Sequence, residues 1–206
     1  MTAPEPIVFI VSGPSGSGKS TLVEKILELP GTMLSISCTT RPPRKTESAG
    51  KWYTFVSESE FQQMAERGEF LEHAQVFGKN WYGTPKKWLD EARMKGLDLV
   101  LEIDVQGALQ VRRKLPGSVA IFVLPPSRAE LERRIRARGQ DSDEEIQRRL
   151  ERARQEMSSY SSYDFAVVND DLDRAGREVQ AIALGSRCGI ARNEERIREI
   201  LKSFGG

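Results

Sequence analysis

Residues 13–20 read Gly13-Pro14-Ser15-Gly16-Ser17-Gly18-Lys19-Ser20, which matches the pattern G-x-x-x-x-G-K-[ST] at every defined position. The apolar run 7–11 precedes this stretch and predicts a buried parallel strand. Apolar residues at helical spacing follow it, from Leu22 to Leu29, and predict a helix. A strand, a glycine-rich loop and a helix in this order are the context in which the pattern forms a phosphate-binding loop.

The loop is chemically suited to bind a polyphosphate. Its three glycines let the backbone approach a ligand closely, and the N–H groups of the loop and of the following helix point into one concavity. Lys19 is expected to reach the β- and γ-phosphates of a nucleoside triphosphate, and the Ser20 hydroxyl to hold Mg²⁺. A glycine-rich turn without a ligand is the alternative, and the lysine, the hydroxyl and the flanking strand argue against it. The predicted donor site comprises Gly13, Pro14, Ser15, Gly16, Ser17, Gly18, Lys19, Ser20 and Thr21.

Length and composition favour one globular domain. The chain has 206 residues, of which 38% are hydrophobic and 30% are charged. Lys and Arg number 31 and Asp and Glu number 30, so the overall charge gives no indication of a nucleic-acid or membrane partner. Cys38 and Cys188 show neither metal-ligand spacing nor a disulfide framework. No targeting segment is visible, so we expect a cytoplasmic protein.

The order of predicted elements favours a three-layer α/β fold with a parallel sheet. Apolar runs at 99–104, 119–124 and 165–168 predict further buried strands, and helical patterns separate them. Two segments interrupt this alternation. Residues 37–96 are rich in short strands and predict a small mixed insert, and residues 125–159 contain two Arg-rich helices. The expected core is therefore 1–36, 97–124 and 160–206.

Local patterns add narrower expectations. Residues 33–37 predict a second short strand, and residues 78–83 predict a turn. Thr84 is expected to cap the next helix, with Pro85 at its first position. A further helix is expected around 108–114. Helix N-caps are predicted by the S-x-x-E pattern at Ser57, Ser127 and Ser142.

Charged residues outside the loop suggest where an acceptor binds. Glu102 and Asp104 are two apart on the predicted strand 99–104, so both are expected to face the same side, at the strand end where ligands bind. Arg41 and Arg44 flank two prolines, which stiffen the chain between two guanidinium groups suited to a phosphate monoester. These residues alone leave open a solvated basic turn.

Six blocks of sequence carry a resemblance to a known family. In chain order they are Ser37-Cys38-Thr39-Thr40-Arg41-Pro42-Pro43-Arg44, Gly50-Lys51-Trp52-Tyr53-Thr54-Phe55, Phe70-Leu71-Glu72-His73-Ala74, Tyr82-Gly83-Thr84, Leu101-Glu102-Ile103-Asp104-Val105-Gln106-Gly107 and Val168-Asn169-Asp170-Asp171-Leu172. In order and spacing these blocks resemble the guanylate kinase family, over about residues 7–182.

The resemblance implies a P-loop fold with a nucleoside-monophosphate-binding insert at 37–96 and a helical lid at 125–159. It also implies Mg²⁺-dependent transfer of the γ-phosphate of ATP to GMP, with dGMP as a second acceptor. On the acceptor side it implies that the GMP phosphate is held by Arg41, Arg44, Tyr53 and Tyr82. The guanine pocket would be lined by Ser37, Glu72, Thr84 and Glu102. Asp104 would lie near the loop and the metal, Asn169 would lie near the ATP base or the lid, and the lid arginines would be Arg134, Arg138 and Arg149.

Glu72 has a chemical reason to select guanine. Guanine presents two donors on one edge, N1–H and N2–H₂, and a carboxylate accepts both, whereas adenine presents an unprotonated N1 there. A site that pairs polar groups in this way rejects the mismatched analogue by roughly 10⁴–10⁵-fold. The structural alternative for Glu72 is a surface strand carboxylate. For the lid arginines it is pairing along the helix, Glu130 with Arg134 and Glu145 with Arg149.

Two other functions stay open at this point. One is a P-loop kinase for a different phosphorylated acceptor, and the other is a non-catalytic guanylate-kinase-like module that binds phosphopeptides. Acidic residues interleaved with the arginines of 125–159 argue against nucleic acid as a partner. The segment 185–206 is expected to be a packing helix or an oligomer contact, and the sequence does not decide between a monomer and a homo-oligomer.

Overall fold

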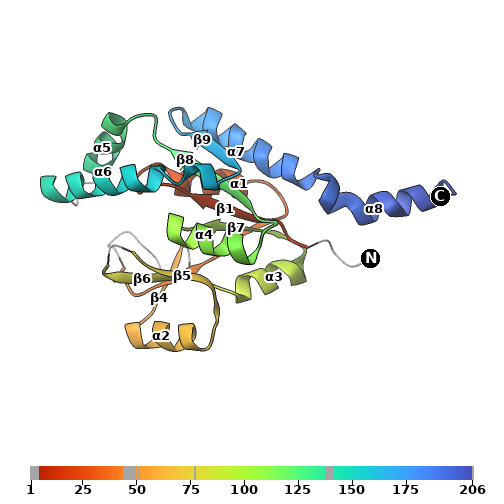
Figure 1. Cartoon of the computed structure of the whole chain (residues 1–206), viewed down its shortest axis with the longest axis horizontal. Helices are drawn as coiled ribbons and strands as arrows, with labels where there is room; N and C mark the ends of the chain where they lie inside the picture. Colours follow the sequence, from red (N-terminus) through yellow and green to blue (C-terminus); the bar gives the residue numbers. More distant parts are fainter. Residues whose placement is uncertain (1–4, 44–49, 51, 77, 138–141, 206) are drawn as a thin grey trace.

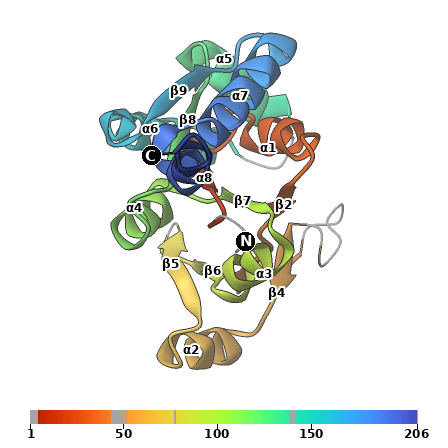
Figure 2. The same cartoon turned by 90° about the vertical axis from the view of Figure 1, so that its right-hand side faces the viewer.

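The computed structural model of the protein describes residues 5–43, 50, 52–76, 78–137 and 142–205. Figure 1 shows a central sheet between helices, a smaller sheet below it, and a helix that leaves the body at the C-terminal end. Figure 2 views the same arrangement along that last helix and separates the two sheets clearly.

The central sheet is parallel and has five strands in the order β2-β7-β1-β8-β9. This confirms the predicted α/β class. The phosphate-binding loop follows the middle strand β1, which has neighbours on both sides and is fully buried. The strands are β1 Val8–Ser12, β2 Thr32–Leu34, β7 Asp98–Glu102, β8 Val119–Leu124 and β9 Phe165–Val168.

Helices cover both faces of this sheet, which explains why its strands are apolar without alternation. On one face, Phe9 and Val11 of β1 pack with α1 (Lys19–Leu27) and α7 (Leu172–Arg187). On the other face, Val8 and Ile10 pack with α3 (Lys87–Lys95) and α4 (Val105–Lys114). The two buried clusters form the core of the three-layer domain.

The smaller sheet is mixed, in the order β4-β3-β6-β5, and it lies within the segment 37–96. One helix, α2 (Glu58–Glu66), covers it through Phe61, whose ring stacks on Phe70 at 4.6 Å. The sheet therefore has an apolar cluster of its own, separate from the core. Its strands are β3 Ser37–Thr39, β4 Tyr53–Phe55, β5 Phe70–Val76 and β6 Asn80–Pro85.

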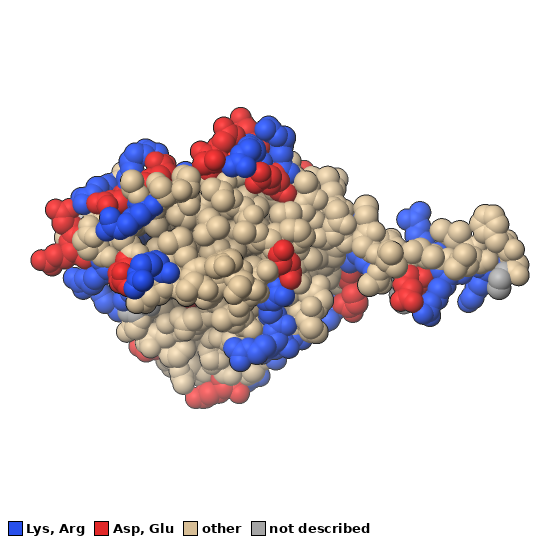
Figure 3. All heavy atoms as spheres, turned by 45° about the horizontal axis from the view of Figure 1, so that its top comes forward, with Lys and Arg blue, Asp and Glu red and all other residues tan. Residues whose placement is uncertain are grey.

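The Arg-rich segment forms α5 (Arg128–Ala137) and α6 (Asp143–Met157), followed by the short 3₁₀ helix η1 (Tyr160–Ser162). The two helices pack on each other through their own apolar cluster, which includes Leu131 and Ile146. In Figure 3, charged side chains of both signs gather at the end of the molecule that these helices form. All three predicted serine caps are confirmed. The hydroxyl oxygens of Ser57, Ser127 and Ser142 each accept from the backbone N–H three residues later, with N···Oγ distances of 3.1 to 3.3 Å.

Three local predictions were wrong. The expected strand 33–37 is two strands in two different sheets, because β2 ends at Leu34 and β3 begins at Ser37. The expected turn 78–83 is mostly β6, which begins at Asn80. Thr84 does not cap α3, because it is buried in β6 and the helix begins only at Lys87.

A further correction concerns the acidic end of β7. The strand ends at Glu102, and Asp104 is the N-cap of α4, which begins at Val105 rather than near 108. The Asp104 carboxylate accepts from the Gly107 N–H at 2.8 Å, as expected for an N-cap aspartate. Glu102 and Asp104 therefore belong to different elements.

The last helix, α8 (Ile190–Ser203), projects from the body, as Figures 1 and 3 show. It is anchored at its first turn, where Arg192 contacts the carboxylate of Asp98 at 3.2 Å. Beyond this anchor the apolar residues of the helix and of its C-cap are exposed, including Ile197, Leu201 and the C-cap Phe204. In the described part of the chain, no helix combines the length and the apolar character needed to cross a membrane.

Candidate active site

The phosphate-binding loop is held in shape by the end of β9. Asn169 follows this strand, is buried, and its side-chain amide donates to the Ser17 carbonyl at 2.8 Å. Gly18 has φ of 94° and lies against the same amide, because a Cβ at this position would be 2.1 Å from Asn169 Nδ2. Only glycine accommodates both the left-handed backbone and this contact.

Lys19 and Ser20 stand at the start of α1, where first-turn amides lack partners within the helix. The Lys19 ammonium donates to the carbonyls of Gly13 at 2.8 Å and Pro14 at 3.0 Å. The Ser20 hydroxyl donates to Glu102 Oε1 at 2.8 Å. A hydroxyl oxygen and a carboxylate side by side are the hard oxygen ligands that Mg²⁺ prefers.

A cavity of about 320 Å³ joins the loop to the smaller sheet. Its wall brings together residues that are far apart in sequence, from the phosphate-binding loop, α1, all four strands of the smaller sheet, β7, the N-cap of α4 and α6. Of the predicted site residues it contains Gly13, Ser15, Gly16, Gly18, Lys19, Ser20, Thr21, Ser37, Arg41, Tyr53, Glu72, Tyr82, Glu102 and Asp104.

Arg41 stands in an aromatic corner of this cavity. Its Nε donates to the Tyr82 hydroxyl at 3.1 Å, and its guanidinium lies 5.6 Å from the centre of the Tyr53 ring. The two tyrosine rings meet edge to face at 5.8 Å. The Arg41 guanidinium and the Tyr82 hydroxyl therefore meet beside the Tyr53 ring, an arrangement that suits a phosphate group. Arg44, the second arginine predicted for this place, lies outside the described residues.

Glu72 is buried, with 3% of its surface exposed, in the wall of the same cavity. The Thr84 hydroxyl donates to its Oε1 at 2.7 Å, and Thr84 Oγ1 lies 3.5 Å from the Ser37 hydroxyl. Burial raises the pKa of Glu72 to about 7; the Thr84 hydrogen bond opposes this rise, and the nearby Asp104 carboxylate adds to it. A carboxylate in this setting can accept hydrogen bonds from a ligand that brings two donors.

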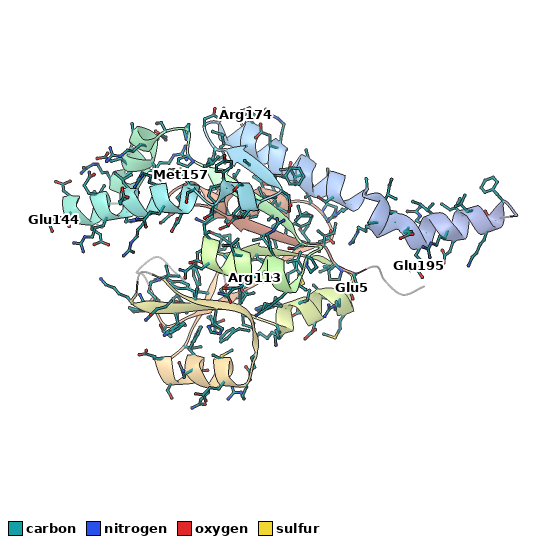
Figure 4. The ribbon with its side chains drawn as sticks, in the orientation of Figure 1. Glu5, Arg113, Glu144, Met157, Arg174 and Glu195 are labelled. Atoms are coloured by element: carbon teal, nitrogen blue, oxygen red, sulfur yellow. The ribbon has the colours of Figure 1, made fainter. Side chains whose placement is uncertain are left out.

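Arg134 and Arg149 connect the helices α5 and α6 to the loop. Arg134 donates to the Ser17 carbonyl at 3.3 Å and to the Asn169 carbonyl at 2.8 Å. Arg149 donates to the Ser15 hydroxyl at 2.8 Å. Figure 4 labels Glu144 and Met157 on α6, and the Met157 end lies over the core while the other end extends outward.

Several predicted residues stand outside the wall of the cavity. Glu130 pairs with Arg134 at 2.8 Å, which agrees with the alternative considered for that arginine, yet the same guanidinium also reaches the loop. Arg138 lies outside the described residues. The remaining members of the predicted set, Pro14, Ser17, Thr84, Arg134, Arg149 and Asn169, are not among the residues that line the cavity.

Glu156 and Trp52 line the cavity and were not predicted to do so. Burial raises the pKa of Glu156, and the facing groups are Lys19, which opposes the rise, and Asp104, which adds to it. Glu156 is two helical turns after Arg149 on α6, and this spacing places both on one face of the helix. That periodicity is the signal by which the sequence could have indicated Glu156.

A sequence model of guanylate kinases matches residues 5–184 of the chain. The chain belongs to the guanylate kinase family. It is 46% identical over 192 residues to the guanylate kinase of Escherichia coli (strain K12), covering 92% of each chain. It is also 46% identical over 200 residues to that of Salmonella typhimurium, covering 96% of each.

A solved guanylate kinase has the same fold. The crystal structure of guanylate kinase from Anaplasma phagocytophilum superposes with a TM-score of 0.81 at 34% sequence identity, and the match covers 98% of this chain and 97% of that one. Membership in the guanylate kinase family thus extends over both sheets and the α5–α6 pair.

Proposed function

We propose that the protein transfers the γ-phosphate of ATP to GMP, yielding ADP and GDP, and that it accepts dGMP as a second substrate. Family membership supports the reaction. The single observation that carries the choice of acceptor is the buried Glu72, which shares one cavity with Lys19 of the phosphate-binding loop. The carboxylate proposed to recognise the base and the lysine proposed to bind the triphosphate therefore face the same cavity.

The acceptor binds against the smaller sheet. Glu72 accepts hydrogen bonds from the N1–H and N2–H₂ groups of guanine. Ser37 lies beside it in the wall, and the buried Thr84 supports the carboxylate from behind the wall. Arg41 holds the 5′-phosphate together with the hydroxyls of Tyr53 and Tyr82, and Arg44 joins this group. Adenine offers Glu72 a lone pair in place of a proton, so a buried carboxylate disfavours AMP.

The donor binds against the phosphate-binding loop, residues 13–21. Loop amides and the Lys19 ammonium bind the phosphates of ATP, and Asn169 keeps the loop in the conformation that this requires. Ser20 and the nearby Asp104 would hold Mg²⁺. Glu102, which the resemblance assigns to the guanine pocket, accepts from the Ser20 hydroxyl at 2.8 Å, so we propose that it holds the metal ion with them instead. When bound, the metal ion supplies positive charge that offsets the negative charge on the phosphates.

Transfer needs positioning and charge neutralisation rather than covalent catalysis. An oxygen of the GMP phosphate attacks the γ-phosphorus in line, the bond to the bridging oxygen breaks, and ADP leaves. Arg41 orients the attacking phosphate. Lys19, Arg134, Arg138 and Arg149 bind the transferred group and spread its charge in the transition state.

We assign the parts of the fold accordingly. Residues 37–96 form the GMP-binding insert and 125–159 the lid, around a core of 1–36, 97–124 and 160–206. Separate apolar clusters in the smaller sheet and in α5–α6 support this division, because each part is stabilised internally and can move against the core. Closure of both parts excludes water and limits hydrolysis of ATP.

The proposal also covers the cellular compartment and the functions that we regard as excluded. The two cysteines are free, which suits the reducing cytoplasm. Many arginines of α5 and α6 are paired with carboxylates, as Arg133 is with Glu130, and this leaves little basic surface for nucleic acid. The intact loop with Lys19 and Ser20 argues against a non-catalytic phosphopeptide module, and Glu72 argues against another phosphorylated acceptor.

A coupled assay of ADP release tests the proposal. The protein is supplied with ATP, Mg²⁺ and, in separate reactions, GMP, dGMP, AMP, UMP or dTMP. We expect GMP to give the highest kcat/KM, followed by dGMP, with the other acceptors lower by several orders of magnitude. Equal use of AMP and GMP contradicts the assignment of Glu72, and ADP release that no acceptor stimulates contradicts the kinase reaction itself.

A further inference from the structure

The first turn of α4 lies directly against the carboxylate of Glu72. A Cβ built on Gly107 would be 2.5 Å from Glu72 Oε2 and 2.9 Å from its Cδ. Non-bonded carbon and oxygen atoms do not approach this closely without displacing each other. The place occupied by the Glu72 carboxylate therefore exists because residue 107 carries no side chain.

The backbone gives no other reason for a glycine at this position. Gly107 is the third residue of α4, it has ordinary helical geometry, and its N–H donates to the capping carboxylate of Asp104 at 2.8 Å. Glycine in a helix is less stable than alanine by about 1 kcal/mol. The close contact with Glu72 explains why a glycine stands here in spite of this loss of helix stability.

The same helix also binds the main chain on either side of Glu72. Gln110 Nε2 donates to the His73 carbonyl at 2.9 Å, and its Oε1 accepts from the His73 N–H at 3.4 Å. Lys114 donates to the Leu71 carbonyl. Within the described residues β5 is the edge strand of the smaller sheet, so these side chains bind backbone groups that face no neighbouring strand there.

Gly107, Gln110 and Lys114 are three and four residues apart, so they form one face of α4. Gln110 and Lys114 on this face hold the main chain of β5 at a fixed distance from α4. Gly107, on the same face, leaves room for the Glu72 carboxylate. Asp104, at the start of the same helix, faces the donor side of the cavity near Lys19. One rigid element thus spans from the triphosphate site to the base-reading carboxylate.

We propose that Gly107 and Gln110 are positioning residues for Glu72 and thereby set the preference for guanine. Neither residue is required to touch a substrate. Gly107 leaves the space in which the carboxylate can meet N1–H and N2–H₂ together, and Gln110 holds the strand that carries it. The proposal rests on the proposed function and adds the residues through which base recognition is adjusted.

The variant Gly107→Ala tests the spatial part. The new methyl group meets the end of a side chain rather than backbone, so Glu72 moves while the fold is retained. We expect the KM for GMP to rise about 10- to 100-fold, as for a displaced hydrogen bond to a charged group, with the KM for ATP within about twofold. We also expect discrimination between GMP and IMP, which lacks the 2-amino group, to fall by at least about tenfold.

Gly185→Ala is the matched control. Gly185 is also a helical glycine, in α7, and a Cβ there meets no atom of the described residues within 4 Å. We expect unchanged kinetics and a midpoint of thermal unfolding equal to or above that of the natural protein, since alanine favours the helix. A general effect of replacing a glycine would change the kinetics of both variants alike. The proposal requires that the KM for GMP and the discrimination between GMP and IMP change only in the variant at position 107.

Two further variants keep the test decisive if Gly107→Ala lowers stability. Gln110→Met preserves the side-chain length but removes both hydrogen bonds to His73. It is expected to raise the KM for GMP and to lower the GMP-to-IMP ratio of kcat/KM.

In the double variant Glu72→Asp, Gly107→Ala the shorter carboxylate fits beneath the methyl group. We expect the two substitutions to be non-additive in the GMP-to-IMP ratio, because the residues are in contact.

The outcomes separate this inference from the function on which it rests. An unchanged KM for GMP and an unchanged GMP-to-IMP ratio in both Gly107→Ala and Gln110→Met overturn the positioning role while leaving the kinase reaction intact. Failure of the natural protein to phosphorylate GMP overturns the function first. A fall in kcat with every acceptor, without a change in the ratio, indicates a purely structural role and also overturns the proposal.

Discussion

The Thr84 hydroxyl donates a 2.7 Å hydrogen bond to Glu72 inside a wall that solvent barely reaches. Burial removes hydration from the carboxylate, and one hydroxyl replaces only part of it, so the pKa of Glu72 rises to about 7. In the proposed function, a guanine edge with two donors supplies the hydrogen bonds that water supplies to an exposed carboxylate. We therefore expect base recognition to depend on pH.

We predict that GMP binding weakens as the pH falls below about 7, the pKa of Glu72 in the folded protein. Only the ionised carboxylate accepts both guanine donors, so the KM for GMP should rise by up to about tenfold for each pH unit below that value. The KM for ATP should not follow this dependence. Steady-state kinetics from pH 5.5 to 8.5 check the prediction, and a flat KM for GMP contradicts it. Because the GMP phosphate also titrates near pH 6, Glu72→Gln measured alongside separates the two effects.

Glu72→Gln is expected to stabilise the protein at pH 8 while reducing its preference for GMP. The folded-state pKa of Glu72 lies above its ordinary value of 4.5, so ionisation destabilises the fold as the pH rises from about 4.5 to about 7. The full shift corresponds to about 3 kcal/mol in the free energy of unfolding, which glutamine avoids while keeping an acceptor for Thr84. Urea unfolding at pH 5 and pH 8 measures it, with the exposed Glu66→Gln as control. Equal stability of variant and natural protein at both pH values contradicts the expectation.

Arg134→Lys should impair the reaction, because an ammonium cannot reproduce the two contacts that the guanidinium makes with Ser17 and Asn169. We expect kcat/KM for ATP to fall about 10- to 100-fold, the effect of losing a charged hydrogen bond. Arg133→Lys is the control, since Arg133 is its neighbour, pairs with the same Glu130 and points to solvent. Comparable losses in both variants indicate a general effect of replacing an arginine on α5, rather than the loss of the two contacts that Arg134 makes with Ser17 and Asn169.

The fold class could be predicted because its signals are local. A buried parallel strand is apolar throughout, a phosphate-binding loop needs its glycines, and serine caps act within one turn. The strand β6 was missed for a local reason as well. Gly83 and Pro85 oppose strand structure in general, but here Gly83 leaves room for the Phe70 ring and Pro85 is the last residue of the strand.

Much of the site could not be predicted from patterns, because its contacts join distant segments. Glu102 meets Ser20 across 82 positions, and Arg134 meets Ser17 across 117. Residue types and spacing indicated the loop and the acceptor-side candidates Arg41, Arg44, Glu102 and Asp104, and the resemblance supplied the other candidates. Neither indicated that Asp104 leaves the strand to cap α4, since the turn after Ile103 depends on the packing of that helix against the sheet.

Ser20→Ala should reduce activity and raise the Mg²⁺ concentration needed for half-maximal rate. The hydroxyl that contacts Glu102 is lost, so one oxygen disappears from the set expected to hold the metal ion. We expect a loss of about 10- to 100-fold in apparent Mg²⁺ affinity, measured by Mg²⁺ titration at fixed ATP. Ser203→Ala, on the surface of α8, should behave as the natural protein. An unchanged Mg²⁺ requirement argues against Ser20 as a metal ligand.

Asp98→Asn should destabilise the fold without altering substrate recognition. Asp98 is buried at the start of β7 and accepts from the Ile7 N–H at 2.9 Å, from Arg187 at 2.8 Å and from Arg192 at 3.2 Å. It thereby ties the N-terminal strand, α7 and the first turn of α8 to one carboxylate. Removing its charge leaves two guanidinium groups without their counter-ion, which costs about 3 kcal/mol for a buried pair. Thermal and urea unfolding measure the loss, with the exposed Asp90→Asn as control. KM values for GMP and ATP at a temperature where the variant is folded should stay within about twofold, since none of these residues lines the cavity.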